Sequence, residues 1–194
     1  MARKKEFDED ALLDKAAELF WRKGYNGTSA QDLVDGLGIN RSSIYNTYTD
    51  KRTLFKKALC QYQATQTGAM LAMLAKAEDA ESTVNEVFKG LIKGSIEDSL
   101  LKGCFMVNTA VELAGQDKEI GDIVNKNNQS VEDALTRLIE KGQQSGQFST
   151  KNSACALARF IFASITSIKV AARTGADEKT LRDIADVALS ALIA

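Results

Sequence analysis

Apolar residues recur every three or four positions along most of this chain, which is the spacing of amphipathic helices. Strict alternation of apolar and polar residues, which would indicate strands, is scarce, and the chain has no proline to interrupt a helix. We therefore expect an all-α protein of about nine helices.

Capping residues and glycines suggest where the helices begin and end. A first helix should begin at Asp8 and end at Gly24, and two short helices should follow within residues 28–50. A fourth helix is predicted from about residue 50 to 76, and at ~1.5 Å per residue it would be about 40 Å long. Glycines separate five further helices, which we expect at about 80–99, 103–115, 117–144, 150–173 and 177–193.

Residues 28–51 have the caps and the glycine turn of two short successive helices. Thr28 is the expected N-cap of the first helix, with Gln31 three positions later as in a capping box. Gly38 suits the positive φ of a helix end, and Asn40 suits the N-cap of the second helix. This arrangement predicts a helix-turn-helix, in which the second helix enters the major groove of DNA.

The second helix of this motif is polar on most of its surface. Ile44 would point inward, whereas Arg41, Ser42, Ser43 and Asn46 are basic or short and can form hydrogen bonds. Such side chains suit base edges and phosphates better than a hydrophobic core.

Residues 8–60 resemble the N-terminal DNA-binding domain of the TetR family of bacterial transcriptional regulators. The matching residues are Ala16, Leu19, Phe20, Gly24, Tyr25, Thr28, Leu33, Gly38, Ser43, Ile44, Tyr45, Tyr48, Lys51, Leu54 and Phe55. The resemblance implies a three-helix DNA-binding domain at 1–52 and a ligand-binding and dimerisation domain at 53–194. It also implies a cytoplasmic homodimeric repressor that binds an inverted-repeat operator in double-stranded DNA and is released by a small-molecule inducer.

The resemblance also assigns roles to residues of the motif. Those expected to face the groove are Gln31, Arg41, Ser42, Ser43 and Asn46, of which Arg41 could bind guanine and Gln31 or Asn46 adenine. Those expected to contact phosphates are Thr28, Ser29, Tyr45, Thr47, Tyr48 and Lys51. For the two tyrosines, a place in the core is the alternative.

A second segment, residues 102–112, resembles part of one branch of the family in which some members respond to electrophiles or oxidants through a cysteine. Cys104 would lie near the start of a helix and close to Lys102, where a thiol is more easily ionised. The alternative is that Cys104 packs the sixth helix against the head, with Asn108 and Glu112 forming polar contacts.

We expect the inducer pocket in the body, between the fifth and eighth helices. Its candidate lining residues are Cys104, Asn108, Phe88, Leu91, Ile92, Phe105, Met106, Val124, Asn127, Asn128, Val131, Phe160 and Ser164. Methionines, aromatic residues and a few amides suit an apolar ligand, but they suit a hydrophobic core as well.

By resemblance, the last two helices form the dimer interface. Their candidate contact residues mix large and small side chains, which let helices approach closely in a four-helix bundle across a twofold axis. They are Ala154, Ala158, Phe162, Ile165, Ala172, Ile184, Ala188 and Ala191. For each of these residues the core of the single subunit is the alternative.

Composition limits the other functions that the chain could have. Histidine is absent, which excludes histidine-dependent nucleophilic catalysis and histidine-ligated metal sites, and no glycine-rich phosphate loop is present. We therefore expect no enzyme, no metal and no cofactor. Because carboxylates and lysines can also catalyse, a small-molecule enzyme on a helical body is the alternative. The formal net charge of −1 means that DNA contacts must be local. It also leaves open a helical protein-interaction module without DNA binding. The basic N-terminal arm of Arg3, Lys4 and Lys5 is expected to be a frayed tail, with a groove contact as the alternative.

No segment predicts export or membrane insertion. The most apolar run, residues 154–172, contains Arg159 and Lys169 and is expected to be a buried helix. Three cysteines without metal-ligand spacing suggest reduced thiols, and Cys60 and Cys155 lie on apolar faces that we expect in the core.

Overall fold

A computed structural model describes residues 8–193 of the chain, and every regular element among them is helical. The basic arm at residues 3–5 lies outside the described residues. The elements are α1 (Glu9–Lys23), α2 (Ala30–Leu37), α3 (Arg41–Tyr48), α4 (Lys51–Tyr62), the π-helical turn η1 (Gln63–Thr67), α5 (Gly68–Ala75), α6 (Ala80–Glu97), α7 (Phe105–Leu113), α8 (Lys118–Gln144), α9 (Ala154–Arg173) and α10 (Glu178–Ile193). With α4, η1 and α5 taken as one rod, this described part forms nine helices, and the predicted all-α fold is confirmed.

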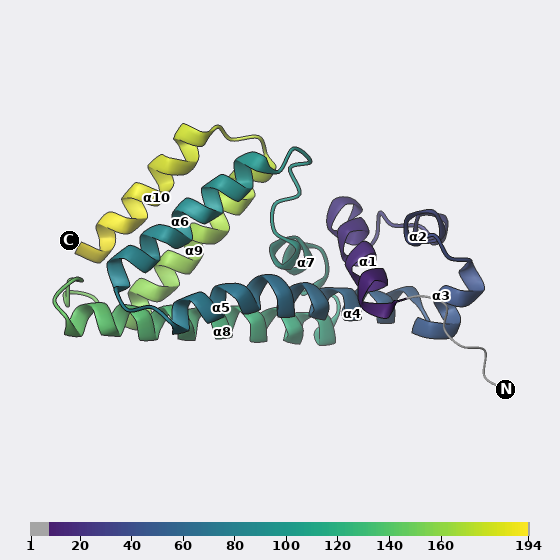
Figure 1. Cartoon of the computed structure of the whole chain (residues 1–194), viewed down its shortest axis with the longest axis horizontal. Helices are drawn as coiled ribbons and strands as arrows, with labels where there is room; N and C mark the ends of the chain where they lie inside the picture. The colour runs from purple at the N-terminus through teal and green to yellow at the C-terminus, as the bar shows by residue number, and fades with distance from the viewer. Residues whose placement is uncertain (1–7, 194) are drawn as a thin grey trace.

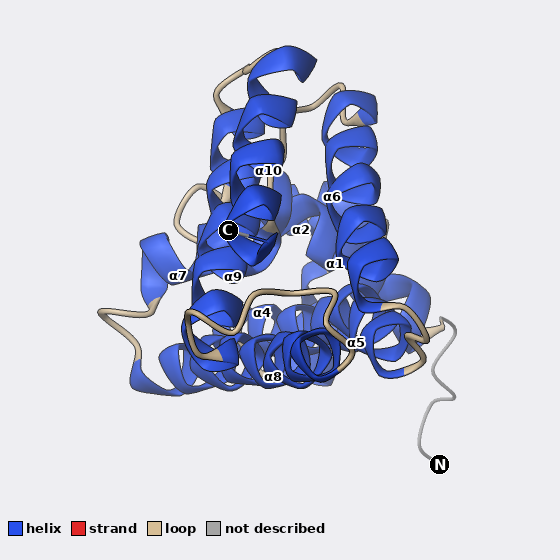
Figure 2. Ribbon diagram, turned by 90° about the vertical axis from the view of Figure 1, so that its left-hand side faces the viewer, coloured by secondary structure: helices blue, strands red, loops and turns tan. Residues whose placement is uncertain are grey.

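The molecule is elongated, with a small head at one end and a larger body at the other. Helices α1 to α3 form the head, and α4, α5 and α8 run along the long axis (Figure 1). Helices α6, α9 and α10 lie together on one side of α5 and α8, as the view from the end also shows (Figure 2). Helix α7 lies between that group and the head (Figure 1).

The rod formed by α4 and α5 contains a π-helical turn that the sequence pattern does not reveal. In residues 63–67 the helix is wider, and the Thr65 hydroxyl donates hydrogen bonds to the carbonyls of Gln61 and Tyr62, both at 3.1 Å. A π-turn contains one residue more than an α-turn, so the face that follows it is rotated. The helix predicted at about 50–76 therefore runs in one direction, but the rows of side chains on α5 are rotated about the helix axis relative to those on α4.

The caps of the two motif helices are partly those expected. Asn40 caps α3 by accepting a hydrogen bond from the Ser43 N–H at 2.8 Å, and Gly38 ends α2 with φ 69°. The predicted capping box of α2 is wrong by one position. Its N-cap is Ser29, whose hydroxyl accepts from the Asp32 N–H at 3.1 Å, and the Asp32 carboxylate accepts from the Ser29 N–H at 2.8 Å.

A hydrophobic core joins the head to the first part of the body. Phe20 of α1 packs edge-on against Phe55 of α4, with ring centroids 5.0 Å apart. Phe55 in turn packs against Phe105 of α7 at 5.5 Å. The same buried cluster reaches Ile120 and Val124 of α8. Apolar packing therefore crosses residue 52, and the division into domains at 1–52 and 53–194 stays a prediction about function.

A separate core forms the body, where α6, α8, α9 and α10 pack around residues such as Leu135, Ile139, Ile161 and Ile168. Helix α9 is the one helix in residues 8–193 that is long and apolar enough to cross a membrane by length and composition. In the structure its inner face belongs to this core, as expected for a helix of a bundle.

Candidate functional site

Helix α3 presents a polar surface at the end of the head. Arg41, Ser42 and Asn46 are exposed, whereas Ile44 is only 1% exposed and fixes the helix to the core. The Arg41 guanidinium lies over the ring of half-buried Tyr45, 5.7 Å from its centroid. The structure thus exposes three of the four groove-facing candidates of α3, whereas Ser43 is half-buried.

Two other groove and phosphate candidates lie at the start of α2. Gln31 is exposed, and its amide donates a hydrogen bond to the Asp35 carboxylate at 2.8 Å. The Ser29 hydroxyl is the N-cap of the helix and donates to the Asp32 carboxylate at 2.8 Å. Both side chains form internal hydrogen bonds that a DNA contact would replace or share.

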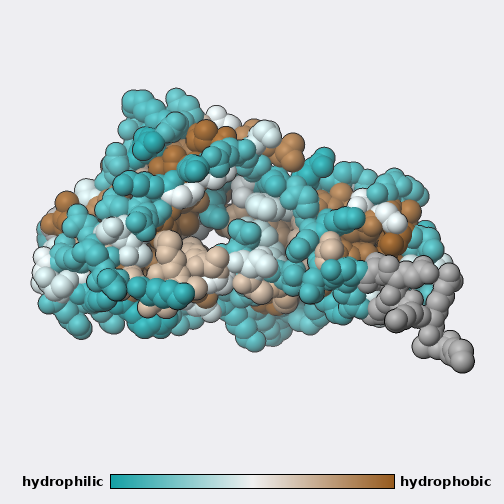
Figure 3. Space-filling view, viewed as in Figure 1, coloured by the Kyte–Doolittle hydropathy of each residue, from teal (hydrophilic) through white to brown (hydrophobic). Residues whose placement is uncertain are grey.

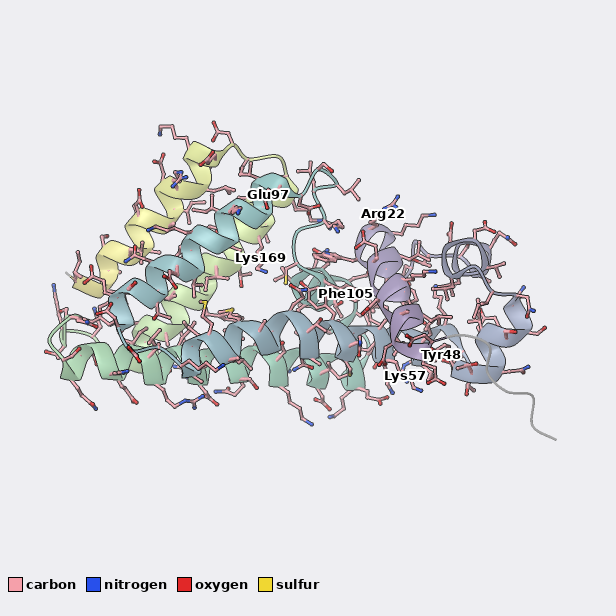
Figure 4. The ribbon with its side chains drawn as sticks, in the orientation of Figure 1. Arg22, Tyr48, Lys57, Glu97, Phe105 and Lys169 are labelled. Carbon is pink, nitrogen blue, oxygen red and sulfur yellow. The ribbon has the colours of Figure 1, made fainter. Side chains whose placement is uncertain are left out.

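Thr28 and Tyr48 are not on the surface, although both were expected to contact phosphates. Each is 1% exposed, and the Thr28 hydroxyl donates to the Gly24 carbonyl at 2.6 Å. Burial raises the pKa of the Tyr48 hydroxyl, which has no hydrogen-bond partner within the described residues. The Lys57 ammonium lies 5.2 Å from the centroid of the Tyr48 ring (Figure 4). The structure favours a core role for both Thr28 and Tyr48.

Lys51 holds the turn before the motif rather than projecting freely. Its ammonium donates hydrogen bonds to the carbonyls of Tyr25 and Thr28, both at 2.8 Å. It also lies 4.3 Å from the centroid of the Tyr25 ring. Since an ammonium has three donors, one remains for a phosphate. Ser43 and Thr47 are half-buried on α3.

An ion-pair cluster joins the start of α4 to the start of α8. The Arg52 guanidinium donates to both carboxylate oxygens of Asp117, at 2.6 and 2.9 Å, and to Glu119 at 2.8 Å. Lys56 pairs with Glu119 as well. Hydrogen bonding from Arg52 lowers the pKa of Asp117 to about 2. This cluster could not be expected beforehand, because nothing in a single sequence links residues that are 65 positions apart.

The segment that leads into α7 is tied to both the head and α9. The carbonyl of Lys102 accepts hydrogen bonds from the Trp21 indole at 3.0 Å, the Asn108 amide at 2.9 Å and Arg173 at 2.5 Å. The Lys102 ammonium pairs with Glu18 of α1 at 3.0 Å. The expectation that Asn108 forms a polar contact is confirmed.

A cavity of about 490 Å³ lies between the rod, α6, α7, α8 and α9. It opens between α5 and α6, where Figure 3 shows a gap in the surface. Of the expected lining residues, those that border it are Cys104, Met106, Asn127, Val131, Leu91 and Asn128. The wall also includes residues that were not among the expected lining residues, chiefly Tyr62, Gln66, Met70, Met73, Glu86 and Lys169. Met70 and Met73 on a predicted helix were a signal that could have identified this wall.

The remaining pocket candidates lie elsewhere, and their expected role as lining residues was wrong. Phe105 belongs to the aromatic cluster that joins the head to the body (Figure 4), and Val124 packs in the same core. Phe88 and Ile92 are buried in the core of the body. Phe160 is 47% exposed on the outer face of α9, and Ser164 lies outside the cavity wall. Asn108 uses its amide on the Lys102 carbonyl. None of these side chains is among those that border the cavity.

Cys104 lies at the N-cap of α7 and borders the cavity. Its sulfur faces the Tyr62 hydroxyl at 3.9 Å, and the side chain is 8% exposed. Burial raises the pKa of the Tyr62 hydroxyl, and the neighbouring Cys104 raises it further. Cys60 and Cys155 are exposed, which corrects their expected place in the core. Within residues 8–193 no cluster of histidine, cysteine and carboxylate side chains could hold a metal.

The expected dimer residues lie mainly inside the single subunit. Ala154, Ala158, Ile165, Ala172 and Ala188 are buried in the body core, and Phe162 and Ile165 also border the cavity. Ile184 and Ala191 are half-buried. The prediction chose the inner faces of α9 and α10, because the most apolar face of a helix is the one that its own core covers.

The outer faces of α9 and α10 carry a different set of apolar side chains. Phe160, Ala163 and Val170 are exposed at helical spacing along α9, with the small polar Ser167 between the last two, and Val187 is exposed on α10. Phe160 is 47% exposed and Val187 is 66% exposed. This is the apolar surface that α9 and α10 present outside the subunit.

Comparison with known proteins identifies relatives along the whole chain. Residues 12–58 match the family model described as bacterial regulatory proteins of the tetR family, and residues 80–188 match the tetracyclin repressor-like C-terminal domain. The chain is 32% identical over 193 residues to the uncharacterized HTH-type transcriptional regulator YezE of Bacillus subtilis (strain 168), covering 99% of this chain and 100% of that protein. It is 30% identical over 188 residues to the HTH-type transcriptional repressor ComR of Escherichia coli (strain K12), and the match covers 96% of this chain and 90% of that protein.

Solved structures share the fold. A cysteine mutant of the TetR family transcriptional regulator CifR, complexed with 26 bp double-strand operator DNA, superposes with a TM-score of 0.86 at 23% identity. The match covers 97% of this chain and 99% of that one.

Proposed function

We propose a specific role for this chain, which belongs to the TetR family of bacterial transcriptional regulators: it binds an inverted-repeat operator as a homodimer and represses transcription. The observation that carries the proposal is the outward face of α3. Arg41, Ser42 and Asn46 are exposed there on a helix that Ile44 and the Asn40 cap hold in place. Arginine and asparagine on a rigid helix match the base edges of the major groove.

The apolar outer faces of α9 and α10 supply the contact between two subunits. A twofold pairing through Phe160, Val170 and Val187 would form a four-helix bundle and place two α3 helices on one side of the dimer. Two such helices read half-sites about 34–36 Å apart or a multiple of that distance. The symmetry of the protein therefore requires an inverted repeat in the DNA.

The cavity provides the means of release. Its wall includes Tyr62 and Gln66 on the rod and Cys104 and Met106 at α7, and both elements contact the head. A ligand that fits better when the rod and α7 have moved favours a dimer whose heads are wrongly spaced. A coupling free energy of about 1–3 kcal/mol between ligand and operator is usual for such systems.

The proposal is tested by titrating the full-length protein into a fluorescent duplex from upstream of its own coding region. We expect binding that falls steeply with salt, because phosphate contacts release counterions, and that exceeds binding to a scrambled duplex of equal length. Equal, weak binding to both duplexes would instead favour a protein-interaction module.

A second candidate is a thiol sensor, favoured by the position of Cys104 on the cavity wall. An activated alkene such as N-ethylmaleimide would form a thioether with its sulfur, and the thiol proton would pass to the α-carbon of the maleimide. The test uses protein in which exposed Cys60 and Cys155 are both replaced by serine. Release of operator DNA by N-ethylmaleimide from this protein, but not after the further change Cys104→Ser, would establish the sensor.

Two further points concern where the protein acts and whether it is an enzyme. We propose that the protein acts in the cytoplasm, where operator DNA lies, and that it has no catalytic activity. The supporting observation is that the cavity wall carries one carboxylate, Glu86, and one amine, Lys169, with no ion pair between them among the contacts of the described residues.

A further inference from the structure

We propose that the cavity beside Cys104 binds an uncharged, largely apolar organic molecule that donates one hydrogen bond to the side chain of Asn127. The inference rests on the proposed function, since it names the chemical class of the ligand for the release site. It follows from three features of the wall: an unsatisfied amide, its apolar surface and the position of its charges.

Asn127 is the unsatisfied group. It is 4% exposed on α8 and borders the cavity, and its amide oxygen has no hydrogen-bond partner among the described residues. The amide nitrogen donates to the Asn128 side chain at 3.4 Å, so the oxygen is the atom left free. A buried acceptor without a partner destabilises the empty state, and a ligand with an N–H or O–H group would remove that cost.

The rest of the wall is mainly apolar and adaptable. Three methionines, Met70, Met73 and Met106, border the cavity together with Val87, Leu91, Val131, Phe162 and Ile165. Thioether side chains adjust their shape to an apolar partner more readily than branched ones. A volume of about 490 Å³ is within the range of sites for small organic ligands.

The charges of the wall exclude a charged ligand from the buried part. Glu86 is exposed and Lys169 is half-buried, so neither charge belongs to the fully buried part of the wall, and their formal charges cancel. Lys169 borders the cavity from α9, on which Figure 4 labels it. The buried wall offers an amide, a thiol and a hydroxyl, from Asn127, Cys104 and Tyr62, but no ion. A buried charge would have no counterion there and would be strongly unfavourable.

The test compares two fluorescent probes that share one skeleton. N-phenyl-1-naphthylamine is neutral and has one N–H group, and 8-anilinonaphthalene-1-sulfonate adds a negative charge. We expect the neutral probe to bind DNA-free protein, one per subunit, at least about tenfold more tightly than the sulfonate, because the buried wall cannot neutralise the charge. Equal affinities, or tighter binding of the sulfonate, would overturn the proposal.

A pair of glycines on α6 shows whether the probe occupies this cavity. Gly90 borders it, and a Cβ there would meet no atom within 4 Å, so Gly90→Leu fills space without a backbone clash. Gly94, one turn further along α6, is equally open but borders only an adjoining cavity, which makes Gly94→Leu the matched control. We expect Gly90→Leu to weaken the neutral probe at least about tenfold and Gly94→Leu to leave it unchanged. The same affinity in both variants would place the probe elsewhere and contradict the proposal.

The hydrogen bond is tested with Asn127→Leu and a third probe. 1-Phenoxynaphthalene has nearly the shape of the amine but carries an ether oxygen in place of the N–H, and displacement of the amine gives its affinity. We expect wild-type protein to prefer the amine by about fivefold or more, and Asn127→Leu to remove this preference. A preference that survives in the variant would exclude Asn127 as the acceptor. These measurements contain no DNA, so the ligand class can fail while operator binding stands, and the reverse.

Discussion

The carboxylate of Glu112 on α7 accepts a hydrogen bond from the backbone N–H of Tyr25, at 3.0 Å, in the turn that follows α1. Its other oxygen accepts from the Asn26 N–H at 2.7 Å. Gly24 has φ 77°, and a Cβ at this position would lie 2.9 Å from the carboxylate. Because the start of α7 borders the cavity, this contact links the ligand site to the turn that positions α2 and α3.

Replacement of Glu112 by alanine should weaken this link. Two backbone donors lose a charged acceptor, so we expect the free energy of unfolding to fall by about 1–3 kcal/mol and operator affinity to fall as well. Urea denaturation and a DNA titration measure the two effects. Glu140→Ala, at an exposed position of α8, is the control. If both variants behave alike, the contact does not position the head.

Phe160 should be essential for the dimer. Phe160→Asp places a charge on the exposed apolar stripe of α9, and we expect monomers at micromolar concentration, because a buried charge without a partner opposes association. Sedimentation velocity shows whether the variant is a monomer or a dimer. Val111→Asp changes a side chain that is 86% exposed on α7 and should leave the dimer intact. A dimeric Phe160→Asp protein would exclude this face as the interface.

Gly142 should not tolerate a side chain. A Cβ at this position would lie 2.2 Å from a ring carbon of Phe148, a residue that is 5% exposed. We expect Gly142→Ala to lower the free energy of unfolding by about 1–3 kcal/mol. Gly94→Ala, where a Cβ meets nothing within 4 Å, should be stabilising by about 0.5–1 kcal/mol. Thermal denaturation followed by circular dichroism measures the stability of both variants. A similar loss of stability in both would contradict the close packing of Gly142 against Phe148.

The bond between Arg52 and Asp117 should make stability depend on acid pH. The pKa of Asp117 is about 2 in the folded protein against 3.8 ordinarily, so its contribution is full above pH 3.8 and is lost as the pH falls toward 2. The pair is partly exposed, so solvent screening keeps the contribution small.

Asp117→Asn isolates this effect, since asparagine also caps a helix and should keep the N-cap of α8. We expect the variant to be less stable than wild type near neutral pH and the difference to shrink as the pH falls below about 4. Urea denaturation across this range gives the comparison. A difference that stays constant with pH would show that ionisation of Asp117 is not its source.

The helices and their faces could be predicted because local signals determine them. Asn40, Gly38 and the periodic apolar positions act on neighbouring residues, and their positions were correct to within a few residues. The cap of α2 was assigned to Thr28 instead of Ser29, since adjacent hydroxyl residues have the same capping ability and the fold chooses between them. Tyr48 shows the same limit, because its burial depends on how α3 packs.

Contacts between distant elements could not be predicted from one sequence. The cavity wall depends on which faces of the rod, α7 and α9 meet, and the π-turn at residues 63–67 rotates one of those faces. Asn127 was a candidate because a few amides suit the wall of a pocket for an apolar ligand, whereas Phe160 was assigned to the pocket although it lies on the outside. The residues next to a position in the sequence do not show which side of its helix will be covered by an element that is distant in the sequence.

The most direct test of the central claim is the affinity of Arg41→Ala for the operator duplex at one fixed salt concentration. Fluorescence anisotropy of the labelled duplex, whose boundaries are first set by footprinting, measures it against wild type and against Arg137→Ala, an exposed arginine on α8. We predict that Arg41→Ala loses about 5- to 150-fold in affinity, as expected for a base-contacting arginine, while Arg137→Ala is unchanged. Equal affinity of all three proteins would contradict recognition of DNA by α3.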